Sequence, residues 1–333
     1  MKRYIVMGLA AAALLTATSC NQDLLNIPQK GVVAYDDFYK TDEDAESALV
    51  AVYQKAVAFD CRGSKSGNTP SYNAVVKACG DELYWGGSKI FDNTAAQDMG
   101  EFRPTLDNNN EHIYNVYDFF YGLIYKCNLL LDNFYGEDGS LCDTPVKKQC
   151  VAEARAIRAW AHFNLATIFY TPPLVDHVLA GDARPTNCDH QDLLTWIVNE
   201  YKLAEKDLPA RNGQGDKDGA VRMTKGACQA LCGKAQMFLG DYAGAKASLK
   251  EVINSGNYAL VPTAQLGDLF HRAGDGCPEK VLEFNAVDNE NMSAYSSMYH
   301  SQRNQSLYFR QMKNLPSNCI QGMGWGNNMG PTE

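Results

Sequence analysis

The sequence lacks the short motifs by which several classes of enzyme and metal protein are recognised. It has no Cys-x-x-Cys pair, no Gly-x-Ser-x-Gly elbow and no His-Glu-x-x-His zinc motif. The glycine-rich stretch 322–326 is followed by no predicted helix and no Lys-Ser/Thr pair, so it is not a phosphate-binding loop. Cys188-Asp189-His190, the nearest approach to a metal-ligand cluster, lacks the spacing of one. We therefore expect no catalytic residue, no metal site and no cofactor.

Positive charge is also scarce. The 30 Lys and Arg residues are outnumbered by 39 Asp and Glu, which gives a net charge of −9. This acidity excludes nucleic acid as an expected partner, because the phosphates would be repelled. It also disfavours electrostatic docking on an anionic membrane. Apolar residues make up 45% of the chain and charged residues 21%, as in globular proteins with a core, and 333 residues suffice for one large domain or two ordinary ones.

One apolar run stands out, at the start of the chain. The basic Met1-Lys2-Arg3 precedes the apolar residues 5–17, and small residues follow up to Cys20. This is the layout of a secretory signal. The run is too short for a permanent transmembrane helix, and polar residues 21–23 come directly after it. We expect residues 1–19 to be a signal peptide.

Cys20 lies where a bacterial lipobox has its acylated cysteine, which becomes the mature N-terminus. A lipid on Cys20 would anchor the chain to a membrane, and loss of Lys2 and Arg3 would make the net charge −11. The alternative is a secreted protein whose cleavage site happens to precede a cysteine. The lipoprotein is favoured because it gives Cys20 a function. The ten remaining cysteines, an even number, permit disulfides in an exported protein.

The spacing of apolar residues indicates helices along most of the chain. Thr41 and Asp44 have the spacing of a capping box and predict a helix of about 16 residues. Residues 60–110 are expected to form long loops, with a short helix near 72–82. Residues 281–285 are expected to form a strand or a short buried segment, and residues 288–333 a loop with aromatic residues. Further helices are expected over residues 113–134, 146–170, 189–208, 224–238 and, after a turn at 240–242, through 253.

One helix pair has the tetratricopeptide pattern, with Gly233, a Gly240-Asp241-Tyr242 turn, Ala245 and Leu249 in order. Small residues at 233 and 245 would let two antiparallel helices touch near their backbones. One such pair cannot bury its apolar faces alone, so the other helices must cover it. The predicted fold is all-α, a scaffold of tetratricopeptide-like helix pairs with long loops.

Four stretches together resemble the SusD/RagB lipoproteins of Bacteroidetes polysaccharide-utilisation systems, and the resemblance covers residues 20–333. These stretches are Cys20-Asn21-Gln22-Asp23-Leu24-Leu25-Asn26-Ile27-Pro28, Phe38 through Ala45, Glu153 through Ala159, and Thr224-Lys225-Gly226-Ala227 running on to Tyr242. The resemblance implies a helical domain over 20–260 and the start of a loop-rich region over 261–333. The family continues beyond the point where this chain ends, so that loop-rich region is expected to be incomplete.

The resemblance also implies a function. Family members lie on the outer surface of the outer membrane, anchored by lipid. They cap a SusC-like TonB-dependent transporter and deliver oligosaccharides to it without catalysis. The alternative from a different class is a helical-repeat lipoprotein that binds peptides or proteins through helix side chains.

Sugar binding needs flat aromatic rings for the C–H faces of a pyranose and polar groups for its hydroxyls. Asp81, Tyr84, Trp85 and Asn93 supply this mix within one predicted loop. The resemblance assigns Trp85, and less directly Tyr84, to the glycan site; the other interpretation is that Trp85 packs the loop onto the helices. A second set lies in the later region, Tyr295, Tyr299 and Trp325, where Trp325 can also be a structural corner.

Two arginines lie in the most apolar predicted helix. Arg155 and Arg158 can be read as anion binders or as buried partners of carboxylates such as Glu153 or Asp132, and we favour the second interpretation. Trp160 and Trp196, on apolar helical faces, are expected in the core.

Overall fold

The computed structural model of the chain describes residues 38–58, 71–80, 83–85, 94–103, 105–107, 109–136, 139–214, 216, 218–285 and 329–331. The chain divides into two units, Met1–Thr41 and Asp42–Glu333. In the first unit the described residues are 38–41, where the Phe38 and Tyr39 rings pack edge to face at 4.6 Å. The predicted signal peptide and Cys20 lie outside the described residues.

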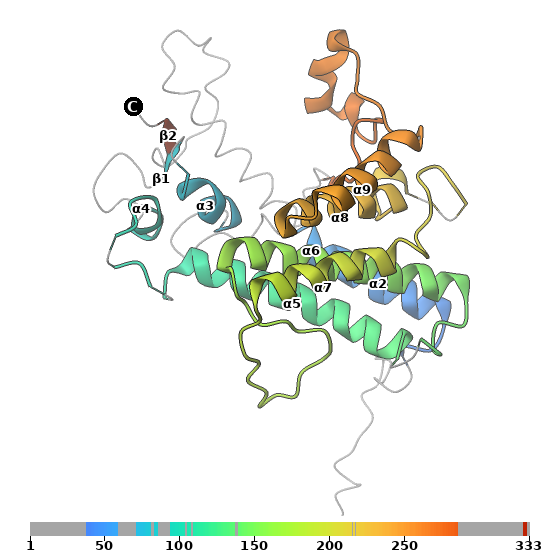
Figure 1. The fold of residues 1–333 in the computed structure, drawn as a ribbon, viewed down its shortest axis with the longest axis horizontal. Helices are drawn as coiled ribbons and strands as arrows, with labels where there is room; N and C mark the ends of the chain where they lie inside the picture. Colours follow the sequence, from blue (N-terminus) through green and yellow to red (C-terminus); the bar gives the residue numbers. More distant parts are fainter. Residues whose placement is uncertain are drawn as a thin grey trace, which may run out of the picture. The chain divides into compact units, whose positions relative to one another are not determined.

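Nearly all regular structure in the described part of the second unit is helical, which confirms the predicted all-α class (Figure 1). The α-helices are α2 (Asp42–Ala56), α3 (Ser71–Ala78), α4 (Thr94–Gly100), α5 (Glu111–Phe134), α6 (Pro145–Phe169), α7 (His190–Ala204), α8 (Lys225–Leu239) and α9 (Tyr242–Asn254). The 3₁₀ helices are η3 (Gly219–Val221), η4 (Thr263–Phe270) and η5 (Arg272–Gly274).

The helices begin where side chains can accept the first backbone N–H groups. Asp189 caps α7 and Thr224 caps α8, both as predicted. Asn110 caps α5, and Thr144 caps α6 directly before Pro145. The Thr144 hydroxyl also donates to Asp42 Oδ1 at 2.6 Å, so the first turns of α2 and α6 are joined.

Two local predictions need correction. The region 86–110, predicted as loop, contains α4, in which Ala96, Gln97 and Met99 are buried. Seven residues are too few for helical periodicity to be evident, and such a short helix depends on tertiary packing. Residues 281–285 form no strand; their backbone is attached to the connector before α8 by a hydrogen bond from Glu283 N to Ala220 O, at 2.8 Å.

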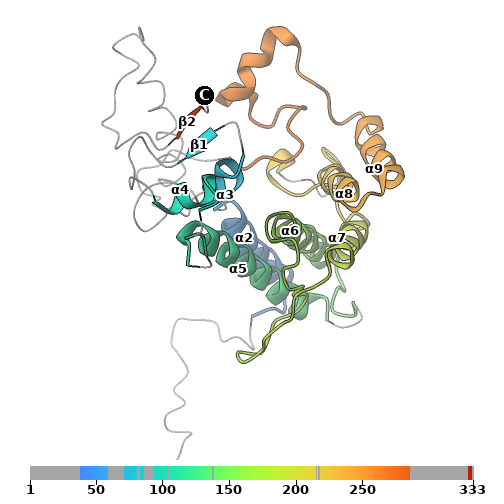
Figure 2. The same cartoon turned by 60° about the vertical axis from the view of Figure 1, so that its left-hand side comes forward.

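Helix α6 lies at the centre of the bundle, in contact with α2, α5 and α7 (Figure 2). Its residues are buried on nearly all sides, as its apolar sequence predicts. The chain continues from α7 to α8 and α9, each packed on the one before. The core therefore runs as successive antiparallel helix contacts, in the manner of a helical repeat.

The α8–α9 pair confirms the predicted tetratricopeptide-like unit. Gly240 ends α8 in the left-handed region at φ 85°, and Asp241 caps α9. A Cβ atom on Gly233 would lie 2.7 Å from Leu249 Cγ, so the two helices approach more closely than any larger residue would allow.

A short two-stranded ladder adds to the all-α scaffold. β1 (Leu83–Trp85) pairs antiparallel with β2 (Met329–Pro331), with Trp85 opposite Met329 and Leu83 opposite Pro331. β1 also contacts α3 and α4. This pairing joins the first predicted loop region to the last residues of the chain.

Candidate functional site

Two of the six predicted sugar-binding residues, Tyr84 and Trp85, lie in the β1–β2 ladder. Tyr84 and Trp85 form the second and third positions of β1, and their backbones pair with Gly330 and Met329. Trp325 stands four residues before Met329 in the sequence. The ladder thus places the backbone of Tyr84 and Trp85 next to the chain segment that follows Trp325 in the sequence.

Asp81, Asn93, Tyr299 and Trp325 lie outside the described residues. For Tyr84 and Trp85 the structure describes the backbone. These six residues therefore remain predicted contacts.

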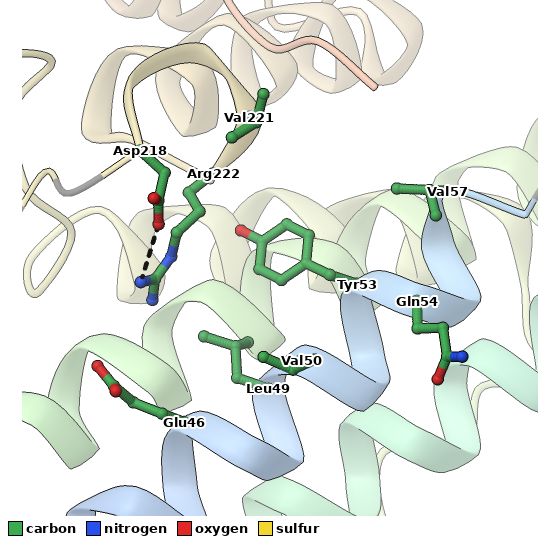
Figure 3. A pocket seen from close by; sticks show the side chains of 9 residues that line it. All are labelled: Glu46, Leu49, Val50, Tyr53, Gln54, Val57, Asp218, Val221 and Arg222. Atoms are coloured by element: carbon green, nitrogen blue, oxygen red, sulfur yellow. Dashed lines mark ion pairs between the residues drawn. The ribbon is translucent and has the colours of Figure 1, made fainter. Parts of the chain in front are cut away.

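A cavity of about 530 Å³ lies between α2 and the connector that contains η3 (Figure 3). Apolar side chains from both elements form much of its wall, and polar groups complete it. It is lined by Glu46, Leu49, Val50, Tyr53, Gln54, Val57, Asp218, Val221 and Arg222. A second cavity of about 410 Å³ shares Glu46 and Arg222 with it and extends toward the start of α6. Neither cavity could be predicted from the sequence, because the residues of their walls are far apart in the chain.

Charge at this cavity is already balanced by protein groups. Arg222 makes two hydrogen bonds to Glu153, at 2.7 and 3.1 Å, and lies 3.6 Å from Asp218. Burial alone would lower the pKa of Arg222, but the Glu153 carboxylate outweighs it and raises that pKa. The Tyr53 hydroxyl donates to Glu153 Oε2 at 2.6 Å and accepts from Met223 N at 2.7 Å. The cavity thus offers apolar surface rather than an unpaired charge.

Burial and the Glu153 carboxylate together hold the pKa of Tyr53 well above its usual range. Tyr53 therefore stays protonated and serves as a hydrogen-bond donor. Nothing in this arrangement supplies a nucleophile beside a base. Its chemistry is that of a binding surface for an apolar group.

The arginines of α6 are paired, but not with the partners predicted. Arg155 and Arg158 each bind one oxygen of Glu200 on α7, at 2.7 and 2.6 Å. Of the predicted partners, Glu153 binds Arg222, and Asp132 accepts a hydrogen bond from Val178 N at 2.9 Å. Glu200 lies more than forty residues after both arginines in the chain. The prediction chose carboxylates nearer in sequence and therefore named the wrong partners. These pairs join α6 to α7.

The helical tryptophans are half-buried rather than fully in the core. Trp160 packs between Phe120 and Phe284, with ring centroids 5.7 and 6.1 Å away. Trp196 lies against the His162 ring at 4.9 Å. Both rings therefore lie at contacts between elements.

The described part of the chain contains neither a metal-binding cluster nor a membrane-spanning helix. No three His, Cys, Asp or Glu side chains gather there as a metal site would require. No helix in those residues has the length and apolar character needed to span a membrane. Cys228 and Cys232, at i and i+4 on α8, are buried packing residues, as predicted.

The stacked helix pairs define a helical-repeat protein of the tetratricopeptide-like class. No family model matches the chain. SusD-like protein P38 of Formosa agariphila is 22% identical over 317 residues, which cover 90% of this chain and 56% of that protein. A laminarin-binding SusD-like protein has a similar structure, with a TM-score of 0.60, 24% identity and coverage of 73% of this chain and 51% of that one.

Surface glycan-binding protein A from Bacteroides uniformis is similar too, with a TM-score of 0.63, 21% identity and coverage of 73% of this chain and 52% of that one. The sequence matches and the shared fold confirm the predicted resemblance to SusD-like proteins. It spans about half the length of the relatives it matches.

Proposed function

We propose that this chain is a surface-exposed lipoprotein that captures oligosaccharides for a SusC-like TonB-dependent transporter of the outer membrane. The observation that carries the proposal is the β1–β2 ladder, which pairs the backbone of Trp85 with that of Met329. Two structural neighbours are named for binding laminarin or surface glycans, and their fold is the fold of this chain.

The chain itself limits how far apart the two predicted sets can be. Trp325 precedes Met329 by four residues, and four residues of extended chain span at most about 14 Å. Paired residues in an antiparallel ladder have Cα atoms about 5 Å apart. This upper limit would allow Trp85 and Trp325 to contact one oligosaccharide of several sugar units, as the proposal requires.

Capture is the activity that these residues support. Trp85, Tyr84, Tyr299 and Trp325 would stack on pyranose faces, and Asp81 and Asn93 would bind hydroxyls. Each contact is weak, so binding of one sugar chain would be readily reversible. A lipid on Cys20 would keep the protein beside its transporter, where the high effective concentration offsets the weak affinity. The role requires no catalytic group.

The test is calorimetric titration of the acyl-free protein with laminarin and with a panel of other oligosaccharides. Trp85→Ala and Trp325→Ala are compared with Tyr242→Ala, a control because Tyr242 is an exposed aromatic residue on α9. We expect saturable binding that each tryptophan variant weakens by about tenfold or more, since stacking contributes about 1–3 kcal/mol by alanine substitution in other systems. A folded wild-type protein that binds no glycan would contradict the proposal.

A second candidate function is peptide or protein binding, and the cavity in Figure 3 favours it because its apolar wall comes from helix side chains. Val50, which is 66% exposed on α2, can be replaced without disturbing the core. If the cavity binds apolar peptide side chains, Val50→Glu will abolish retention of a fluorescent peptide library and leave glycan binding unchanged. If Val50→Glu retains the peptide library as well as the wild type does, the result favours the glycan-binding function alone.

A further inference from the structure

A row of tyrosines follows one face of α5. Tyr114, Tyr117, Tyr121 and Tyr125 are spaced by three or four residues, which places them along one side of the helix. Tyr114, Tyr117 and Tyr125 are exposed. The Tyr117 ring packs against Tyr121 at 4.6 Å and edge to face against Phe169 at 5.3 Å. The row therefore reaches the end of α6.

The next residue, Tyr170, has an unusual backbone. Its φ and ψ are 65° and −63°, and Thr171 N donates to Phe169 O at 2.8 Å. This is a γ-turn with positive φ, a strained conformation that is rare outside glycine. Tyr170 is nevertheless 66% exposed, so burial in the core does not compensate for the strain.

His190 lies flat against Tyr170. The two rings stack with centroids 4.2 Å apart and planes at 18°. His190 Nδ1 lies 2.7 Å from Tyr170 O, and a carbonyl only accepts, so Nδ1 carries the proton. In the neutral ring Nε2 is then an acceptor. One face of the Tyr170 ring is covered by His190, while the residue as a whole remains largely exposed.

The surrounding chain holds this pair in place. The loop between α6 and α7 leaves the bundle and returns (Figure 1), and its ends are joined by a bridge between Pro173 and Asn187. Cys188 N also donates to Pro172 O at 3.3 Å. From α5, the Tyr121 hydroxyl donates to Pro173 O at 2.7 Å. The aromatic pair is thus preorganised before any ligand arrives.

We infer that Tyr170 and His190 form a second carbohydrate-binding site, on which the C–H face of a pyranose stacks against the exposed Tyr170 ring. His190 Nε2 would accept a hydrogen bond from a sugar hydroxyl. The α5 tyrosines extend the surface for neighbouring sugar units. A flat aromatic ring with one hydrogen-bond acceptor at its edge suits a pyranose. A nucleic-acid base also stacks on such a ring, but its phosphates would be repelled by this acidic protein.

This inference rests on the proposed glycan-binding function and adds a site made by other elements than β1 and β2. Two sites that bind one polysaccharide raise its apparent affinity by more than either contact alone. Loss of the second site should therefore weaken the binding of polymers. It should have little effect on the binding of short oligosaccharides, which reach one site only.

The test is affinity electrophoresis in gels that contain laminarin, soluble starch or xylan. Tyr170→Gly is the informative variant, since glycine adopts φ near 65° without strain and should keep or raise the melting temperature. We expect it to weaken polymer binding by about tenfold, while Tyr170→Phe retains the ring and the affinity. Tyr242→Ala, at an equally exposed tyrosine, should bind like the wild type.

Hydrogen exchange of the backbone amides shows where on the protein the polysaccharide binds. On addition of the bound polysaccharide, peptides within residues 167–191 should become protected in the wild type and in Trp85→Ala, but not in Tyr170→Gly. Retardation of Tyr170→Gly equal to that of the wild type would overturn the second site and leave the proposed function intact. A folded wild-type protein retarded in none of the three gels would overturn both.

Discussion

The Glu153 carboxylate has no exposed surface and accepts two hydrogen bonds from the guanidinium of Arg222, at 2.7 and 3.1 Å. Glu153 lies on α6, and Arg222 follows η3 in the connector to α8. The pair therefore holds the connector against the central helix and shapes one wall of the cavity in Figure 3.

Arg222→Ala should be strongly destabilising, because it leaves the buried Glu153 without its cation. We expect a loss of about 3–5 kcal/mol in the free energy of unfolding, measured by urea denaturation. The control is the double variant Arg222→Met with Glu153→Gln, which removes both charges and should recover part of the loss. If the double variant is less stable than Arg222→Ala, the buried charge is not the cause.

The stability of the protein should depend on pH through His162. Burial, the largest effect, lowers the pKa of this histidine to about 3. Its Nδ1 donates to Arg158 O at 3.1 Å, and its Nε2 accepts from Val175 N at 3.2 Å, so the folded state holds the neutral ring. The unfolded chain binds the proton below about pH 6.5. Stability is thus fully present above that pH and falls as the pH is lowered toward 3.

The expected loss from His162 at pH 5 is about 2 kcal/mol relative to pH 7. Urea denaturation at several pH values measures it. His162→Gln keeps a polar side chain that does not titrate, so this variant should be less stable at pH 7 and show a smaller change between pH 7 and 5. An unchanged pH dependence in the variant would assign the effect to other groups.

Gly233→Ala should destabilise the α8–α9 pair, because the new Cβ would lie 2.7 Å from Leu249 Cγ. We expect a loss of about 1–3 kcal/mol, read from the thermal unfolding midpoint and the denaturant curve. Gly267→Ala is the matched control, since a Cβ there meets no atom within 4 Å. Adding Leu249→Ala to Gly233→Ala should relieve the steric part of the loss; a purely additive result would argue against the clash.

Cys20→Ala should abolish lipid attachment and release the protein from the membrane fraction, because a single residue would carry the acyl chains. Incorporation of a labelled fatty acid in a bacterial host, followed by cell fractionation, measures this. Cys79→Ala, at an exposed cysteine after α3, is the control and should be labelled like the wild type. Equal labelling of both variants would contradict the lipidation of Cys20.

Local features of the sequence were enough to predict most helix ends and the main fold class. Asp189 and Thr224 cap helices through hydrogen bonds to residues two or three positions away, and Gly240 ends α8 with its own backbone conformation. Such interactions join residues that are close in sequence, so a pattern of residue types along the sequence predicts them. The family resemblance likewise came from short stretches in the right order.

Tertiary structure decided what depends on partners distant in the chain. Arg155 and Arg158 bind Glu200, Glu153 binds Arg222, and Trp85 pairs with Met329, and no local pattern distinguishes these partners from nearer ones. The strained turn at Tyr170 is equally invisible in sequence, because it depends on how the loop returns to His190. The sequence by itself determined which segments become helices through local hydrogen bonds. The packing of those helices determined which charges and rings meet, since burial and contact are properties of the assembled chain.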